Sequence, residues 1–233
     1  MNIYKIDFTD FFTSAFSVDC LIFGYKEGKI NTLLIKRSVD PYKDNWAIPG
    51  DLVYPDEDLP AAAERILREL TGLTNIPMHQ AHTFGSPSRH PQGRVITIAY
   101  FALVRIEDVS IRASSWANEI KWEPVLDVGT LAFDHNEILD ATFDRLKKQL
   151  SIEPICFELL PEKFTLNEFQ QLFEYIKGTA YDKANFRKKI KGIPLIPHTE
   201  KQTNVKHRPA RLYSFDGENE LDRLEQSEWI FKM

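Results

Sequence analysis

One stretch of the chain places charged side chains at intervals typical of a catalytic helix. In GDLVYPDEDLPAAAERILRELTGL, residues 50–73, Arg65 and Glu69 stand four residues apart. Carboxylates clustered on one helical turn can hold Mg²⁺, which prefers octahedral oxygen coordination and promotes attack on phosphorus. Two neighbouring positions, however, are the apolar Ile66 and Leu70. The stretch keeps the spacing of a metal-binding helix but lacks two of its carboxylates.

The segments around this stretch predict a sheet that holds the helix in place. Asp58 suits an N-cap, Pro60 suits a first helical turn, and Gly72 suits a helix end. Two short runs of bulky aliphatic residues, 17–25 and 30–36, precede the helix and are separated by a turn that contains a glycine. This pattern predicts a β-hairpin.

Further apolar patterns complete a first domain over residues 1–150. The run VITIAYFALV, residues 95–104, is apolar on both faces and predicts a central strand covered on both sides. A short strand is expected at 119–122, and apolar spacing over 135–150 predicts a helix with one buried face. We therefore expect an α+β architecture, in which a mixed sheet lies between helices in an α/β/α sandwich.

The composition indicates a soluble globular protein. No apolar run approaches the ~20 residues that span a bilayer, and the N-terminus has acidic residues where a signal peptide would be basic. We expect a cytoplasmic protein that does not associate with membranes. Cys20 and Cys156 lie among apolar residues, which favours two buried thiols over a disulfide or a metal pair.

Positive charge is concentrated towards the C-terminus. Residues 162–215 contain eleven Lys and Arg against five Asp and Glu, a net charge of +6, although the whole chain carries −5. Two prolines predict a stiff linker over 151–163. We expect a second domain over 164–216, followed by an acidic tail, 217–233.

The second domain has the order of elements of a winged helix-turn-helix. Thr165 and Glu168 predict a capping box before one helix, and Asp182 caps a short second helix. Two strand candidates then flank a basic tip, and such an arrangement places a helix in the DNA major groove and a wing against phosphates. An isolated charge run would indicate only a solvated helix face. The residues expected to contact DNA are Lys183, Asn185, Arg187, Lys188, Lys189, Lys191, Lys206, His207, Arg208 and Arg211.

The first domain resembles a Nudix domain, whose box reads G-x5-E-x7-REUxEExGU, where U is aliphatic. The preceding segments DCLIFGY, LLIKR and WAIPG are also similar to that family. The matching box positions are Glu57, Arg65, Leu67 and Glu69, and the departing ones are Asp51, Ile66 and Leu70. In the hydrolases of this family the helix glutamates hold Mg²⁺, so the resemblance implies a frame whose catalytic carboxylates are incomplete.

Both domains together resemble the Nudix-related transcription regulators, which join a ligand-sensing Nudix domain to a C-terminal winged helix and act as dimers. The similarity runs from Val18 to Phe215 and is carried by TFGSPSRHPQGRVITIAYFALV, EPICFELLPEKFTLNEFQQLFEYI, DKANFRKKI and RPARLYSF. One branch of this group senses ADP-ribose, and another responds to L-arabinose. The motifs ILRELTGL and FELLPEKFTL are closer to the sugar-responsive type.

This resemblance implies a homodimeric, effector-responsive regulator that binds a double-stranded DNA operator. We expect it to control genes of pentose use through a sugar or nucleotide-sugar effector, as repressor or activator, with no cofactor. The candidate effector-binding residues are Arg37, Trp46, Glu69, Arg89 and His90. The alternative is a Mg²⁺-dependent hydrolase of ADP-ribose or a related nucleoside diphosphate derivative, in which Glu69 and Glu57 would be catalytic and Glu69 would bind the metal.

Overall fold

The computed structural model describes residues 14–150, 154–203 and 208–216. The chain divides into two compact units. The first comprises Met1–Phe23, Thr32–Ala102 and Ser110–Thr142, and the second comprises Gly24–Asn31, Leu103–Val109 and Phe143–Met233. The second unit therefore takes in the end of the first hairpin as well as the C-terminal residues, and the domain boundaries expected from the sequence stay a prediction.

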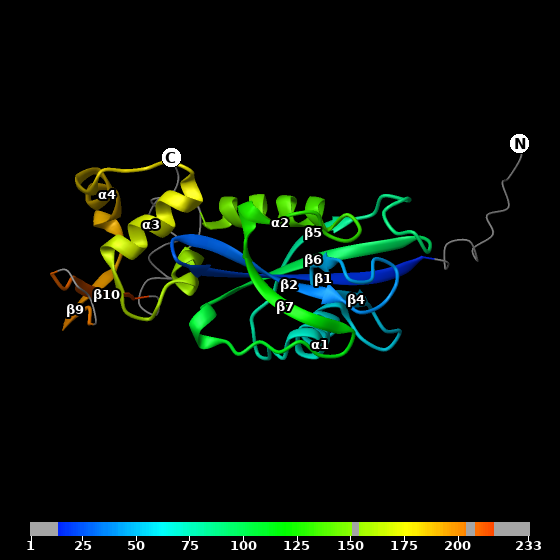
Figure 1. Ribbon diagram of the computed structural model, residues 1–233. Coiled ribbons are helices and arrows are strands. Elements are labelled where there is room, and N and C mark those ends of the chain that lie inside the picture. Colours follow the sequence, from blue (N-terminus) through cyan, green and yellow to red (C-terminus); the bar gives the residue numbers. More distant parts are fainter. Residues whose placement is uncertain (1–13, 151–153, 204–207, 217–233) are drawn as a thin grey trace, which may run out of the picture. The chain divides into compact units, whose positions relative to one another are not determined.

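Seven strands of the described chain form one sheet (Figure 1). They are β1 (Ala15–Lys26), β2 (Lys29–Arg37), β3 (Trp46–Ala47), β4 (Gly50–Leu52), β5 (His79–Phe84), β6 (Val95–Val104) and β7 (Ala117–Pro124). The order along the sheet is β3-β2-β1-β6-β5, with β4 paired to β1 and β7 paired to β2. The run at 95–104 is β6, buried along nearly its whole length between two strands, which confirms the expected central strand.

The predicted hairpin is formed by β1 and β2. Glu27 and Gly28 connect them with positive φ angles of 52° and 79°. Two central residues with positive φ are the signature of a tight turn whose twist matches that of the flanking strands.

Helices α1 (Leu59–Thr71) and α2 (His135–Leu150) match the helices predicted from the sequence. The Asp58 side chain accepts a hydrogen bond from the backbone N–H of Ala61, and Gly72 ends α1 at φ 77°. Figure 1 shows α1 and the start of α2 on opposite sides of the sheet, which confirms the expected layers. Short 3-10 helices occur at η2 (Ile106–Asp108), η3 (Val125–Asp127), η4 (Pro154–Leu159) and η5 (Ile190–Gly192).

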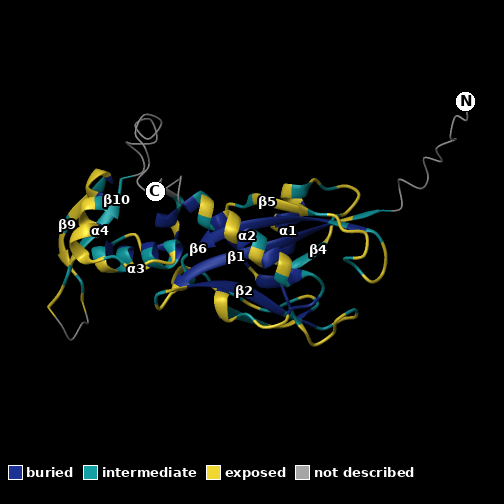
Figure 2. Cartoon of the chain, turned by 90° about the horizontal axis from the view of Figure 1, so that it is seen from above, coloured by how far each residue is buried: buried dark blue, intermediate teal, exposed yellow. Residues whose placement is uncertain are grey.

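The C-terminal residues form a winged helix. Its elements are β8 (Phe164–Thr165), α3 (Leu166–Lys177), α4 (Lys183–Lys189), β9 (Leu195–Lys201) and β10 (Arg211–Phe215), with strand order β8-β10-β9. The predicted capping box of Thr165 and Glu168 is present at the start of α3. Phe169, Phe173 and Phe186 pack edge to face in the core, so one side of α4 is buried and the other is left to solvent (Figure 2).

Both cysteines are free and buried, as expected. Burial raises the pKa of each thiol well above its usual range, so both stay protonated and unreactive. Among the described residues, no helix is long and apolar enough to cross a membrane.

Candidate functional site

Arg65 fastens the loop before α1 to the helix. Its Nε and Nη2 donate to Glu57 Oε2 and Oε1 at 2.9 and 2.6 Å, and Nη2 also donates to the Leu52 carbonyl at 2.8 Å. The Tyr54 ring lies under the guanidinium at 3.9 Å, and the Tyr54 N–H donates to Glu57 Oε1. The hydrogen bond from Arg65 lowers the pKa of Glu57. Through these contacts Glu57 and Arg65 stabilise the junction between the loop and α1.

We predict that Arg65→Ala lowers the free energy of unfolding by about 2 kcal/mol, because a bidentate pair and a carbonyl contact are lost from a mostly buried site. Chemical denaturation at pH 7 measures the change. Arg68→Ala is the control, since Arg68 lies on the same helix with a side chain that is 58% exposed. If the two variants were equally stable, Arg65 would not stabilise the fold through these contacts.

The α1 carboxylates do not fit a Mg²⁺ cluster. Ile66 and Leu70 are each 1% exposed and make that face of the helix part of the core. Both Glu57 oxygens are engaged by Arg65, and among the described residues the half-exposed Glu69 side chain pairs with Arg65 and Arg68, at 3.4 and 3.9 Å. In the described part of the chain, no three His, Cys, Asp or Glu side chains are grouped so that they could hold a metal ion.

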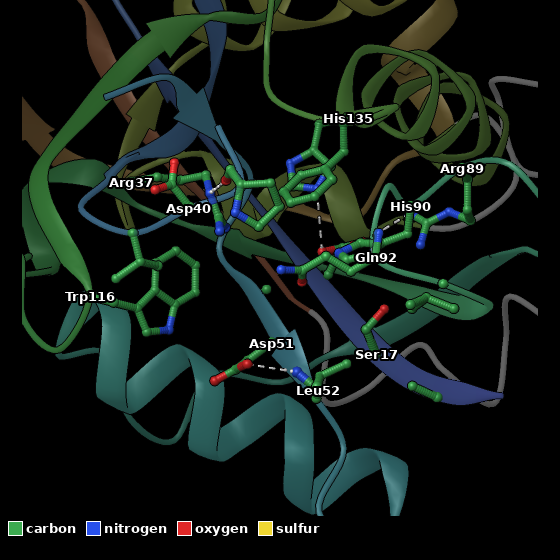
Figure 3. A pocket seen from close by; sticks show the side chains of 18 of the residues that line it. Ser17, Arg37, Asp40, Asp51, Leu52, Arg89, His90, Gln92, Trp116 and His135 are labelled. Carbon is green, nitrogen blue, oxygen red and sulfur yellow. Dashed lines mark hydrogen bonds and ion pairs between the residues drawn. The ribbon is translucent and has the colours of Figure 1, made fainter. Parts of the chain in front are cut away.

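A cavity of about 470 Å³ opens beside β1 and β4 (Figure 3). This volume lies within the range of small-molecule sites. In the view of Figure 3, Arg37 and Trp116 lie on one side, Arg89 and His90 on the other, and His135 above. The cavity therefore combines two guanidinium groups with aromatic rings, which are groups that suit an anionic ligand carrying a ring.

Arg37 has unused hydrogen-bond donors at the cavity. It is 8% exposed, its Nε donates to the Pro41 carbonyl at 2.8 Å, and its guanidinium lies 4.9 Å from the ring centres of both Trp116 and Phe133. Burial lowers its pKa, although a guanidinium stays charged. Its two terminal nitrogens have no acceptor in the described part of the chain. A buried cation with free donors is costly unless a ligand accepts from it.

Arg89, by contrast, is already paired. Its Nε and Nη2 donate to the two oxygens of Asp134 at 2.8 and 2.7 Å, and its side chain is 5% exposed. Asp19 lies farther away, with its Oδ2 at 3.9 Å from Arg89 Nη2. The pair fixes the loop before α2 against the loop that carries Arg89.

The floor of the cavity is polar. Asp19 Oδ2 accepts from Thr97 Oγ1 at 2.9 Å, and Thr97 shares a hydrogen bond with Ser17. His135 Nδ1 accepts from the Ile48 N–H at 2.9 Å, which leaves the proton of the neutral ring on Nε2. Burial lowers the pKa of His135 to about 3 and raises that of Asp19 to about 6. At pH 7 the floor therefore carries one carboxylate beside a neutral imidazole.

A second hollow of about 300 Å³ lies in the winged helix between α3, α4 and β10. The exposed Lys183, Arg187 and Arg211 line it, and the amides Asn167 and Gln170 lie beside them. The three cations have no acidic partner within 4.0 Å in the described chain. They form a basic rim that suits the phosphates of nucleic acid.

The other residues expected to contact DNA differ in exposure and in their hydrogen bonds. Lys188, Lys191 and Arg208 are exposed, and Lys189 lies 5.4 Å from the Tyr181 ring centre. Asn185 donates to the Asp182 carboxylate, so its side chain is occupied with capping α4. Lys206 and His207 lie outside the described residues. For the Asn185 side chain to contact DNA as expected, its hydrogen bond to Asp182 would have to break.

Comparison with known proteins assigns both parts of the chain. The Nudix domain model matches residues 13–146, and the model of the NrtR DNA-binding winged helix domain matches 156–215. The chain belongs to the NrtR-type Nudix proteins. The ADPR responsive transcriptional repressor NtrR of Acinetobacter baylyi is 33% identical to this NrtR-type chain over 89% of its length and 84% of the relative.

Solved NrtR structures agree with the fold of this NrtR-type protein. Shewanella oneidensis NrtR complexed with a 27mer DNA is 30% identical with a TM-score of 0.70, over 86% of this chain and 93% of that one. The NUDIX domain of the same protein complexed with ADP ribose is 29% identical with a TM-score of 0.55, over 61% of this chain and 94% of that one. A Nudix sheet followed by a winged helix is thus confirmed.

Only some of the expected effector residues meet in the NrtR-type cavity. Arg37, Arg89 and His90 line it, and His90 stacks on Phe133 at 5.0 Å between ring centres. Trp46 lies elsewhere, with Lys121 Nζ 4.4 Å from its ring centre, and Glu69 is likewise outside the lining, beside Arg65.

Sequence reasoning missed several lining residues, namely Asp19, Trp116, Phe133 and His135. One signal was present. Asp19 is the single charged residue in β1 before its last residue, Lys26, and apolar residues follow it towards the centre of the strand. A charge inside such a strand is expensive to bury, so its presence points to a site.

Proposed function

We propose that this protein is a DNA-binding transcription repressor whose Nudix domain binds ADP-ribose and whose winged helix then releases its operator. The observation that carries this proposal is the buried Arg37 guanidinium with free donors at the cavity. Supporting it, a relative similar over both domains is an ADP-ribose-responsive repressor, and a related NUDIX domain is known in complex with ADP ribose.

The cavity chemistry suits a nucleoside diphosphate sugar. A guanidinium binds phosphate oxygens through charge-assisted, often paired hydrogen bonds. Trp116, next to Arg37, offers an aromatic ring on which a base can stack, and Phe133 and His90 stack on each other and extend the aromatic surface. ADP-ribose supplies a diphosphate, an adenine and hydroxyl groups in one molecule.

The sugar-responsive type expected from the sequence finds no support in the comparisons. An uncharged pentose would bring no anion to the terminal nitrogens of the buried Arg37, whereas a diphosphate accepts hydrogen bonds from them. ADP-ribose is therefore the proposed effector, in place of the expected pentose. The expected control of pentose genes is likewise not supported.

Release of DNA requires coupling between two sites. ADP-ribose lowers operator affinity only if it binds the DNA-free arrangement more tightly than the DNA-bound one, and by linkage the operator lowers ADP-ribose affinity by the same factor. As a homodimer, the protein would present two winged helices to half-sites about one helical turn apart. The dimer is part of this proposal.

The DNA-binding part is tested by Arg187→Ala combined with Lys188→Ala. We expect about 30-fold weaker operator binding and a salt dependence reduced by about two phosphate contacts, because both side chains are exposed on α4. The operator is first selected from random duplexes, and affinities are then measured by gel shift at several salt concentrations.

The matched control is Lys43→Ala with Arg68→Ala, which removes the same charge from exposed positions of the Nudix domain. Circular dichroism confirms that both double variants are folded. If the α4 variant and the control bound the operator equally strongly, Arg187 and Lys188 would not belong to the DNA-binding surface.

A further inference from the structure

The acid on the cavity floor has an oxygen without a hydrogen-bond donor. The Asp19 side chain is 7% exposed, and its Oδ2 accepts from Thr97 Oγ1. Its Oδ1 lies 3.8 Å from His135 Nε2, too far for a hydrogen bond, and has no donor in the described part of the chain. An ionised carboxylate has room for about four hydrogen bonds, so the set around Asp19 is incomplete.

Arg89 and His135, which lie next to Asp19, are held in place by hydrogen bonds to other residues. Arg89 is bound by both oxygens of Asp134, and His135 is held by the Ile48 N–H. Arg89 therefore offers Asp19 a nearby charge but no hydrogen bond. The buried carboxylate is unfavourable for the free protein, which suggests that it is completed by a ligand.

The cavity is polarised by the positions of its charges. The terminal nitrogens of Arg37 have no acceptor among the described residues, whereas Arg89 is bound by both oxygens of Asp134. Arg89 and Arg37 attract the Asp19 carboxylate and Asp134 repels it, but the groups that lie closest to it on the floor, Thr97, Ser17 and His135, are neutral. A phosphate would be attracted to Arg37 and repelled from Asp19.

The backbone at Gly50 leaves space for the acid. Gly50 pairs with Asp19 across β4 and β1, and a methyl group at position 50 would overlap Asp19 Oδ1. The glycine therefore permits the carboxylate to lie at the floor of the cavity. In the box of related hydrolases the first glycine aligns one position later, at Asp51.

We propose that Asp19 accepts a hydrogen bond from a ribose hydroxyl of the effector and makes the cavity select a free hydroxyl over a phosphate at that point. This inference rests on the proposed function, because it takes ADP-ribose as the effector. Asp19 is thus a specificity-determining residue in the same cavity as the anion-binding Arg37.

Isothermal titration calorimetry tests the inference with three ligands, namely ADP-ribose, ADP-ribose 2′-phosphate and ADP. The proteins are the wild type, Asp19→Ala, Asp19→Asn and the control Asp56→Asn, whose carboxylate is exposed and outside the cavity. Asp19→Ala is expected to bind ADP-ribose about tenfold more weakly, because a hydrogen bond to a charged group is lost. Asp19→Asn keeps the shape of the side chain and guards against a folding defect in Asp19→Ala.

Two patterns support the inference and distinguish the two riboses. If Asp19 reads the adenosine ribose, the wild type rejects the 2′-phosphate at least tenfold and Asp19→Asn accepts it. If Asp19 reads the terminal ribose, ADP binds the wild type and Asp19→Ala equally, while ADP-ribose loses its advantage in Asp19→Ala.

The inference is overturned if both Asp19 variants bind all three ligands within twofold of the wild type. That result leaves the proposed function standing. Failure of the wild type itself to bind ADP-ribose would instead remove the proposed function, and this inference with it, so the two failures are separable.

Discussion

Replacing Arg37 by alanine is expected to weaken ADP-ribose binding about 100-fold. The guanidinium is buried between Trp116 and Phe133 at the cavity, and its terminal nitrogens have no acceptor among the residues that the structure describes. Truncating one partner of a buried, hydrogen-bonded charge pair typically costs 2–5 kcal/mol or more, and each ~1.4 kcal/mol is a factor of ten in affinity. Calorimetric titration with ADP-ribose measures the loss.

Two further variants sharpen this experiment. Arg37→Lys keeps the charge but loses the planar fork and the stacking, so an intermediate loss of about tenfold is expected. Arg68→Ala removes an exposed arginine from α1 and should bind like the wild type. If Arg37→Ala bound ADP-ribose within threefold of the wild type, Arg37 would not be the anion-binding residue.

Asp19→Asn is expected to make the free protein more stable at pH 8, by on the order of 3 kcal/mol. Burial raises the pKa of Asp19 from its usual 3.8 to about 6 in the folded state. The folded protein therefore binds this proton more tightly than the unfolded chain does, and the ionised side chain opposes folding. This cost is fully present above pH 6 and disappears below about pH 4, and a neutral asparagine never incurs it.

Urea denaturation of the wild type and Asp19→Asn at pH 8 and pH 4 measures this difference. The stability gain should be large at pH 8 and should vanish at pH 4. The buried His135, whose pKa is lowered to about 3, also affects acid stability, but it is present in both proteins and cancels. Asp56→Asn, at an exposed site, should show no gain. A variant less stable than the wild type at pH 8 would mean that Asp19 supports the fold.

Local signals were enough to predict the helices. The caps of α1 at Asp58 and Gly72, and the Thr165 and Glu168 capping box of α3, act within a few residues of the chain. Apolar spacing likewise identified α2, whose apolar residues Ile138, Leu146 and Leu150 are buried. Such features depend on residues that are close in sequence, so they can be predicted without knowledge of the tertiary structure.

The cavity could be predicted only in part, because its contacts join distant segments. Arg89 and Asp134 are 45 residues apart, and no local spacing marks them as a pair. His135 was read as the start of a helix, which is correct, but its ring also anchors the Ile48 backbone. The expected sugar effector followed from the local motifs ILRELTGL and FELLPEKFTL, whereas the proposed anionic effector follows from Arg37, whose contacts join distant segments.

We propose that this protein binds both ADP-ribose and DNA and that bound ADP-ribose makes the protein release its DNA. The direct measurement is fluorescence anisotropy of a labelled operator duplex bound to the full-length protein and titrated with ADP-ribose. We predict that anisotropy falls to the value of free DNA for the wild type, that Arg37→Ala responds only at much higher ADP-ribose, and that L-arabinose has no effect. An operator that stays bound at saturating ADP-ribose, or that L-arabinose releases instead, would contradict the claim.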